Sequence, residues 1–340
     1  MAKPPSQEFL LISEIQKILP SFPLSPYQES IGDDAAVRVN NTPGEKLVLT
    51  TDISVQDVHF TLQTMTFEEI GYRAMVSNLS DCAAMGALPD SAVVQLVFPK
   101  NSHDLVKSVE SIYKGFARAC ERWRFPIVGG DLSSGKIWTI GITLIGALAA
   151  EERVLKRRGI KAGDALWVSG KPGASAAGLR AMQQWGRKKA SIFYPKLVEA
   201  HIIPRPRIEL GKAMTSLDRV HAMMDLSDGL SKDIATLCYE NNVGFLFECG
   251  AVVPSKEMEQ LAAELNENWK AWFFHGGEEY ELLISAEPDF DLRSFDCAKS
   301  ADIRRLGFFT SDFEGVRTSV AGGGTKELGY GSWDHVKRIL

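Results

Sequence analysis

Carboxylates recur in this chain in short islands that also carry glycine, serine or threonine. The islands are Ile31-Gly32-Asp33-Asp34-Ala35-Ala36-Val37, Thr50-Thr51-Asp52, Asn78-Leu79-Ser80-Asp81, Gly129-Gly130-Asp131 and Asp225-Leu226-Ser227-Asp228. A single island predicts a turn, because Gly-Asp and Asp-Asp pairs are common in turns. Several islands of hard oxygen ligands in one chain indicate a shared acidic pocket that binds a cation such as Mg²⁺.

Several common catalytic and nucleotide-binding motifs are missing from the sequence. No G-x-S-x-G nucleophile elbow is present, and the histidines are scattered. The segment from Gly130 to Lys136 fits the first part of a P-loop, but Ile137 stands where the Mg²⁺-binding Ser or Thr belongs. A strand, not a helix, is predicted to follow it. No G-x-G-x-x-G follows a predicted strand, so the usual dinucleotide fingerprint is excluded as well.

Composition limits the function classes further. An apolar fraction of 45% and a charged fraction of 24% are typical of a globular protein. The net charge of -5, without a long basic run, argues against nucleic acid as a partner. The five cysteines are widely spaced and form no C-x-x-C pair, which predicts a reduced compartment and no structural zinc. The longest apolar stretch, residues 137–150, is too short to span a bilayer of about 30 Å. We therefore expect a cytoplasmic protein without a membrane segment.

The elements around the islands alternate between helices and strands, which predicts an α/β chain. A helix is expected over residues 7–18, and a buried strand over 46–49 that places Thr50, Thr51 and Asp52 at its end. Thr66 and Glu69 form a capping box that begins a helix toward Gly86, with Asn78 and Asp81 on one face. Strands over 126–128 and 221–224 are expected to lead into Asp131 and Asp225.

Other segments leave alternatives open. Ser102 is predicted to cap a helix that runs to about residue 119. A strand over 164–169, a glycine loop over 170–175 and a helix from about 176 predict either a phosphate site at a helix N-terminus or tight packing of small residues. Ser227 and Asp228 precede another helix and can be its caps. A charged run over 151–158 predicts a boundary between domains 1–150 and 151–340, since a single core rarely exceeds about 250 to 300 residues.

Taken in order, these motifs resemble those of the thiamine-monophosphate kinase family over nearly the whole chain. The resembling segments are the Ile31 to Val37 island, Thr50-Thr51-Asp52 with Val58-His59-Phe60, Asn78 to Asp81 with Ala83-Ala84-Met85-Gly86, Val128 to Asp131, Asp225 to Leu230, and Gly276-Gly277-Glu278. The superfamily includes aminoimidazole-ribonucleotide synthetase, selenophosphate synthetase and a hydrogenase-maturation dehydratase, whose members bind ATP with magnesium. The resemblance implies a two-domain α/β (α+β) fold of the aminoimidazole-ribonucleotide synthetase type. Its N-terminal domain dimerises through its sheet, and the ATP site lies against that interface.

The resemblance also implies a reaction and the residues that serve it. The reaction is direct in-line transfer of the γ-phosphate of ATP to thiamine monophosphate, assisted by several Mg²⁺ ions and needing no general base. The implied magnesium ligands are Asp34, Thr50, Thr51, Asp52, Asp81, Asp131, Asp225 and Asp228, with Asp33 either a weaker ligand or the hinge beside Asp34. The implied ATP contacts are Gly130, Asp131, Arg157, Ser227 and Tyr113. The implied thiamine pocket is His59, Glu278 and Trp333, and core packing is the alternative for Trp333.

Two positions depart from the family pattern, and two rival readings remain. Glu279 stands where the family commonly has Asp, and Lys171 to Ser175 replaces the usual small-residue loop. One rival is another ATP-dependent enzyme of the superfamily, but selenophosphate synthetase should show a reactive Cys near the N-terminus, whereas the first cysteine here is Cys82. The hydrogenase-maturation protein should end in Cys, and this chain ends in Leu340. The other rival is a non-catalytic nucleotide- or thiamine-binding regulator, which would not need so many metal ligands.

Overall fold

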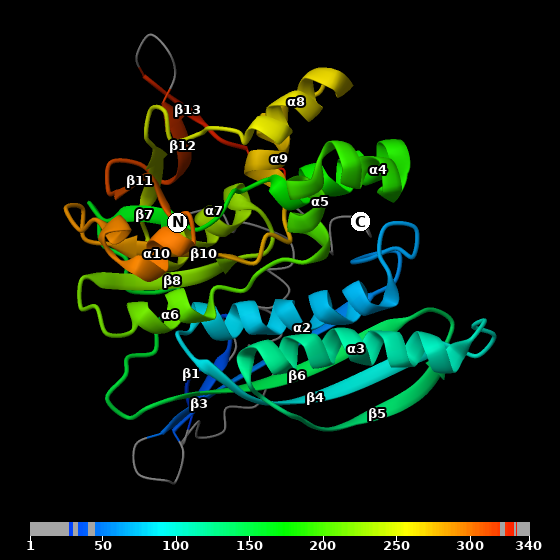
Figure 1. Cartoon of the computed structure of the whole chain (residues 1–340). Coiled ribbons are helices and arrows are strands. Elements are labelled where there is room, and N and C mark those ends of the chain that lie inside the picture. The colour runs from blue at the N-terminus through cyan, green and yellow to red at the C-terminus, as the bar shows by residue number, and fades with distance from the viewer. Residues whose placement is uncertain (1–26, 30–32, 40–44, 320–323, 330, 332–340) are drawn as a thin grey trace.

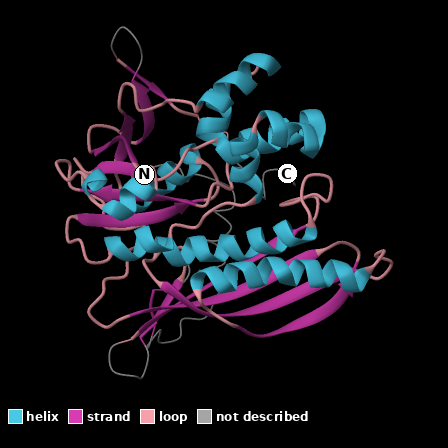
Figure 2. Cartoon of the chain, viewed as in Figure 1, coloured by secondary structure: helices cyan, strands magenta, loops and turns pink. Residues whose placement is uncertain are grey.

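The structure is a computed structural model that describes residues 27–29, 33–39, 45–319, 324–329 and 331. It contains two β-sheets, each packed against helices, which confirms the mixed α/β fold (Figure 2). The predicted helix over 7–18 and Trp333 lie outside the described residues. The predicted boundary after residue 150 falls between the last strand of the first sheet and the first strand of the second. No helix within the described ranges is long and apolar enough to cross a membrane.

The first sheet has six strands in the order β1-β2-β3-β6-β4-β5. Neighbouring strands are antiparallel except β4 and β5, which are parallel. Two helices, α2 (Phe67–Ala84) and α3 (Leu105–Trp123), cover one face of this sheet (Figure 1). The strands are β1 (Tyr27–Glu29), β2 (Ala36–Val39), β3 (Lys46–Val55), β4 (Leu88–Pro99), β5 (Ile127–Gly135) and β6 (Thr139–Leu148).

Strand β3 is longer than the sequence predicts. It pairs with β6 over its whole length, so the Thr50-Thr51-Asp52 island lies inside the strand and not at its end. Successive side chains in a strand point to opposite faces of the sheet. Thr50 is therefore buried on the side of α2, and Thr51 is exposed on the other side.

Strand β5 also extends past its predicted end, so that Gly129, Gly130 and Asp131 are strand residues and not a loop. Its pairing with β4 is so close that a Cβ on Gly130 would lie 2.1 Å from the carbonyl oxygen of Val94. The next element is β6, so no helix follows the P-loop-like segment, as predicted. As the last strand of the sheet order, β5 has a free edge and is exposed along nearly its whole length.

Helix α2 lies between the two sheets and is buried on almost every side (Figure 1). The predicted capping box is confirmed, because Thr66 accepts from the backbone N of Glu69 and the Glu69 carboxylate accepts from the backbone N of Thr66. From residue 70 to residue 84, only Ser77 and Asp81 are not fully buried. Helix α3 begins at Leu105 after Asp104, so the predicted start at Ser102 was wrong; the Asp104 backbone is left-handed (φ 52°) and gives no side-chain cap.

The second sheet has seven strands in the order β13-β12-β9-β11-β7-β10-β8, antiparallel except for the parallel pair β12 and β9. The strands are β7 (Ala165–Val168), β8 (Val220–Leu226), β9 (Gly244–Phe247), β10 (Glu281–Ala286), β11 (Arg304–Thr310), β12 (Gly315–Ser319) and β13 (Thr325–Glu327). The helices of this half are α4 (Ala174–Phe193), α5 (Pro195–Ile202), α6 (Ile208–Met214), α7 (Leu230–Asn241), α8 (Lys256–Leu265), α9 (Trp269–His275), the 3-10 turn η1 (Leu292–Ser294) and α10 (Asp296–Ser300). Strand β8 and helix α6 pack on α2, which joins the two halves.

Candidate metal centre

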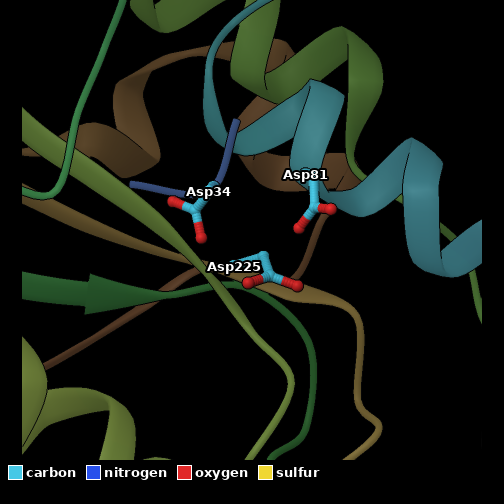
Figure 3. Close-up of side chains that lie close together, drawn as sticks. All are labelled: Asp34, Asp81 and Asp225. Atoms are coloured by element: carbon cyan, nitrogen blue, oxygen red, sulfur yellow. The ribbon is translucent and has the colours of Figure 1, made fainter. Parts of the chain in front are cut away.

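Three carboxylates from distant parts of the chain meet between the two sheets. Asp34 precedes β2, Asp81 lies on the last turn of α2, and Asp225 is near the end of β8. One carboxylate oxygen from each of them lies within 4.8 Å of the others. Figure 3 shows the three side chains pointing toward a common centre. We call Asp34, Asp81 and Asp225 the acidic trio.

Burial makes the charged trio costly without a cation. Burial raises the pKa of Asp81 well above its ordinary value, and the neighbouring carboxylates Asp52 and Asp225 raise it further. Burial likewise raises the pKa of Asp225, and the Asp34 carboxylate adds to the effect. Hydroxyl groups compensate only in part, because Thr50 donates to Asp81, and Ser80 donates to Asp225 at 3.0 Å. The arrangement favours a bound cation over three clustered negative charges.

Arg157 places a positive charge directly against the trio. Its Nε donates to Asp34 Oδ1 at 3.1 Å, and its Nη2 donates to the same oxygen. The other oxygen of Asp34, Oδ2, is buried and has no hydrogen-bond partner among the described residues. A buried carboxylate oxygen without a partner is the kind of group that a metal ion satisfies. That Arg157 contacts ATP remains a prediction. The structure adds that Arg157 binds Asp34, which is one of the three carboxylates of the trio.

Asp33 holds the segment that carries Asp34. Its carboxylate accepts from the backbone N of Asp34 at 2.9 Å and from the backbone N of Arg157 at 3.4 Å. Burial raises the pKa of Asp33 to about 7, and repulsion from Asp34 contributes. These contacts fasten the loop before β2 to the segment between the two sheets.

Asp52 and Asp228 extend the acidic region beyond the trio. Burial raises the pKa of Asp52, a hydrogen bond from Ser77 opposes the shift, and the charge of Asp228 adds to it. Asp228 forms an ion pair with Lys232 at 2.7 Å. Both carboxylates were predicted as magnesium ligands, and the structure places them beside the trio.

Asp233 is a residue of this region that the sequence did not single out. Its carboxylate accepts from the backbone N of Asp228 and of Gly229, each at 3.1 Å, at the start of α7. The alternative that Ser227 and Asp228 cap α7 was wrong, since Gly229 is the N-cap and no side chain caps it. The Ser227 hydroxyl instead lies 3.4 Å from Asp225 Oδ1. An Asp five residues after Asp228 is the only sequence signal that could have pointed to this role.

Thr51, Gly130 and Asp131 were also predicted to bind magnesium or ATP, but they lie in the first sheet, apart from the acidic trio. Thr51 donates to the carbonyl of Ile142 at 3.0 Å on the exposed face of the first sheet. The register aligns Ile53, Gly141, Gln95 and Asp131 across four strands, so Asp131 shares the face of Thr51. Within the described chain these residues do not join the trio, and their predicted roles in binding magnesium and ATP remain predictions.

Tyr113 also stays apart from the acidic trio. It lies on α3, and its ring packs edge to face on Phe116 at a centroid distance of 5.1 Å. Burial raises the pKa of its hydroxyl. This packing leaves its predicted nucleotide contact untested.

The predicted thiamine pocket is represented by His59 and Glu278, which come from different halves of the molecule. His59 follows β3, and its Nδ1 accepts from the backbone N of Val55 at 3.1 Å. Glu278 precedes β10, and its carboxylate pairs with Arg73 of α2 at 2.6 Å. Arg73 therefore links the two predicted pocket residues, although no sequence motif identified it.

The glycine loop before α4 is filled by a side chain of the protein. The Glu279 carboxylate accepts from the backbone N of Gly173 at 2.9 Å and of Ser175 at 3.2 Å, which are the amides that a phosphate would use. Burial raises the pKa of Glu279 well above its ordinary value. A phosphate site at this helix N-terminus was thus a wrong alternative, and internal packing is the observed one.

Comparison with known proteins supports the two-part organisation. The family description "AIR synthase related protein, N-terminal domain" matches residues 32–148, and "AIR synthase related protein, C-terminal domain" matches residues 161–312. The chain is 33% identical to the thiamine-monophosphate kinase of Corynebacterium glutamicum over 259 residues, which are 76% of this chain and 77% of the relative. It is 33% identical to the thiamine-monophosphate kinase of Aquifex aeolicus over 278 residues, 82% of this chain and 85% of the relative. A solved structure described as AaThiL complexed with AMPPCP and TMP is similar with a TM-score of 0.82 and 29% identity, covering 97% of each chain.

Proposed function

The chain belongs to the thiamine-monophosphate kinase family, and from this membership we propose that it transfers the γ-phosphate of ATP to thiamine monophosphate. The products are thiamine diphosphate and ADP. The observation that carries the proposal is the acidic trio, because Asp34, Asp81 and Asp225 come from three separate motifs and converge between the two domains. The solved relative described with AMPPCP and TMP supports the same pair of substrates.

The residues of the trio fit magnesium. They offer hard carboxylate oxygens, and Asp34 Oδ2 is buried with its hydrogen-bonding capacity unused among the described residues. Asp52 and Asp228 are near enough to the trio to hold further ions, which supports a site for several Mg²⁺ ions. Bound Mg²⁺ supplies charge neutralisation between two phosphate-bearing substrates, whose like charges at about 4 Å repel by roughly 4 kcal/mol per pair at an effective dielectric near 20.

The chain then acts by alignment and not by proton abstraction. The acceptor is a phosphate monoester with a second pKa of about 6, so it is already mostly dianionic at neutral pH. An in-line transfer needs the donor and acceptor phosphates held end to end, which fixed carboxylates on rigid elements accomplish. Asp81 lies on the buried helix α2, and Asp225 lies near the end of β8, which packs on α2, so the packing of both domains determines their positions. No general base is assigned.

The open face of the first sheet supports a homodimer with the ATP site near its interface. Strand β5 has a free edge, and Val128 and Leu132 on it are 63% and 57% exposed. An unpaired strand edge with exposed apolar side chains favours association with a second surface. Gly130 and Asp131, the predicted ATP contacts, lie on this same strand.

The direct test incubates the purified protein with ATP, Mg²⁺ and thiamine monophosphate and separates the products by anion-exchange chromatography. We expect thiamine diphosphate and ADP in equal amounts, with no ADP when the acceptor is omitted. Absence of thiamine diphosphate, or ADP release that does not depend on the acceptor, would contradict the proposal. A chelator control should abolish the reaction, because the trio lacks its cation under that condition.

A further inference from the structure

Arg73 is a buried arginine that contacts both predicted parts of the acceptor pocket. It lies on α2 and is only 4% exposed. Its Nη1 donates to the carbonyl oxygen of His59 at 2.8 Å, and its Nη2 lies 2.6 Å from Glu278 Oε2. Its guanidinium carbon is 5.9 Å from the ring centroid of Tyr280. One side chain thus joins a loop of the first domain to a loop of the second.

A gain in folding stability does not explain why an arginine is buried at position 73. A buried guanidinium has lost its hydration, and Arg73 Nε has no hydrogen-bond partner among the described residues. Well-packed apolar residues in place of a buried ion pair are often neutral or stabilising. An incompletely satisfied arginine that contacts both domains therefore indicates a requirement for its geometry.

The backbone around Glu278 shows that this loop is held in one conformation. Glu278 and Tyr280 both have left-handed backbones, with φ of 61° and 54°. The backbone N of Glu278 donates to the carbonyl of Ser227 at 2.6 Å, and that of Tyr280 donates to the carbonyl of Leu226 at 2.9 Å. Left-handed non-glycine residues persist only where surrounding contacts determine them, and they concentrate at functional sites. These backbone bonds fix the loop, whereas Arg73 fixes the direction of the Glu278 side chain.

We propose that Arg73 is a positioning residue for thiamine monophosphate: it holds the Glu278 carboxylate and the His59 loop at a fixed separation, so that both domains face the acceptor together. The proposal rests on the proposed function, which supplies the acceptor. Arg73 contacts Glu278 Oε2 and the carbonyl oxygen of His59 with one guanidinium group. The planar guanidinium is suited to this task, because its fork can serve two acceptors in one fixed geometry.

The experiment compares Arg73→Met with the wild type in two binding titrations. One measures the Kd for thiamine monophosphate, and the other measures the Kd for a non-hydrolysable ATP analogue with Mg²⁺. We expect the acceptor Kd of Arg73→Met to rise about tenfold to hundredfold, as for loss of a hydrogen-bonded charge contact, and the nucleotide Kd to stay within about twofold. An unchanged acceptor Kd, or an equal loss in both titrations, overturns the proposal.

Arg187→Met is the matched control. Arg187 lies on α4 and also joins the two domains through a glutamate of α2, since it pairs with Glu69 and donates to the carbonyl of Thr64 at 3.0 Å. We expect this variant to unfold at a lower temperature with an unchanged acceptor Kd. If Arg187→Met weakens acceptor binding as much as Arg73→Met does, general loosening of the domain contact explains the effect and the positioning role is wrong.

Two further variants test whether Arg73 acts through Glu278. In a double-mutant cycle, Glu278→Gln together with Arg73→Met should weaken acceptor binding no more than the stronger single variant, because both remove the same arrangement. If the double variant instead raises the acceptor Kd by the product of the two single effects, the proposal is overturned. If Arg73→Met fails to fold, Arg73→Lys and Arg73→Gln replace it: the lysine should retain more acceptor affinity than the glutamine, and equal affinities overturn the proposal.

The test separates this inference from the proposed function. If the wild type binds thiamine monophosphate but makes no thiamine diphosphate, the proposed reaction is wrong, and the binding titrations still decide the role of Arg73. If the wild type makes thiamine diphosphate and Arg73→Met retains its acceptor Kd, the reaction is supported and the positioning role is wrong.

Discussion

The acidic trio lies between the two domains, whereas Thr51 and Asp131 lie on the open face of the first sheet. The trio is assembled from the loop before β2, from α2 and from β8, and its carboxylates are buried or nearly so. Thr51 and Asp131 are exposed and have only the sheet behind them. Two adjacent residues of β3 belong to different regions. Thr50 donates to Asp81 of the trio, whereas Thr51 points to the open face of the sheet.

The contrast between the buried trio and the open face shows which part of the candidate site a single chain contains. The acidic trio has its full set of carboxylates and is held by the packing of α2 between two sheets. The open face offers polar groups at a strand edge without a wall opposite them in the described chain, so a second copy is the simplest way to complete it. The proposed metal site therefore lies within one chain, whereas part of the proposed nucleotide site lies at the surface of the proposed dimer.

The largest effect is expected at the trio. Asp81→Asn removes one charge and one oxygen ligand from the centre of the cluster, and metal-assisted charge stabilisation is worth several kcal/mol. We expect the rate of thiamine diphosphate formation to fall about 10³-fold or more, with the circular dichroism spectrum unchanged. Asp296→Asn is the control, since its side chain is 96% exposed and far along the chain from the trio motifs. Near wild-type activity of Asp81→Asn would remove Asp81 from the metal centre.

A smaller effect is expected at the open face. Leu132→Lys places a charge on the free edge strand, which disfavours edge pairing but leaves the trio intact. We expect dissociation into monomers by light scattering and a loss of activity of about tenfold to hundredfold that is recovered in part at high protein concentration. Arg293→Ala, at a mostly exposed ion pair of the second domain, should change neither quantity. Full activity in a proven monomer would show that one chain completes the nucleotide site.

A third prediction concerns stability and pH. Asp81 and Asp225 have a higher pKa in the folded chain than in the unfolded one, so they bind protons more tightly when folded. Their contribution to stability is therefore present at low pH and is lost as the pH rises from about 4 toward the raised values. Without divalent metal, Asp225→Asn should be more stable than the wild type at about pH 8, by a Tm difference of about 2–4 °C.

The same measurement with Mg²⁺ should reverse the order. A cation that binds the folded wild type stabilises it by mass action and removes the repulsion among the carboxylates. Asp225→Asn should gain less from Mg²⁺ because it has lost one ligand. If the Tm difference between the two proteins is the same with and without Mg²⁺, the trio does not bind the ion.

The smallest effect is expected from Arg157→Gln. The guanidinium of Arg157 already occupies Asp34 Oδ1, so it competes with a metal ion for that carboxylate. Removing this positive charge should tighten Mn²⁺ binding in the absence of nucleotide by about threefold to tenfold, measured by electron paramagnetic resonance. Weaker Mn²⁺ binding in this variant would show that Arg157 supports the metal centre.

Local features of the fold were predictable from the sequence where neighbouring residues decide them. The start of α2 was one such feature, since a capping box is closed by residues three positions apart. The ends of β3 and β5 were not, because their pairing with β6 and β4 extends both strands through the polar islands. The start of α3 was also missed, since Ser102 makes no cap and the chain enters the helix through a left-handed Asp104.

The sequence by itself determined the chemistry of this protein: islands of aspartate with serine, threonine and glycine, in an order that resembles one family of kinases. Tertiary structure decided which of these residues meet. Strand alternation separates Thr51 from Thr50, sheet register places Asp131 on the exposed face, and α2 brings Asp81 to Asp34 and Asp225. Glu279 fills the glycine loop, and Arg73 pairs with Glu278, through contacts between residues more than a hundred positions apart. Such contacts depend on packing between distant elements, which motif spacing does not encode.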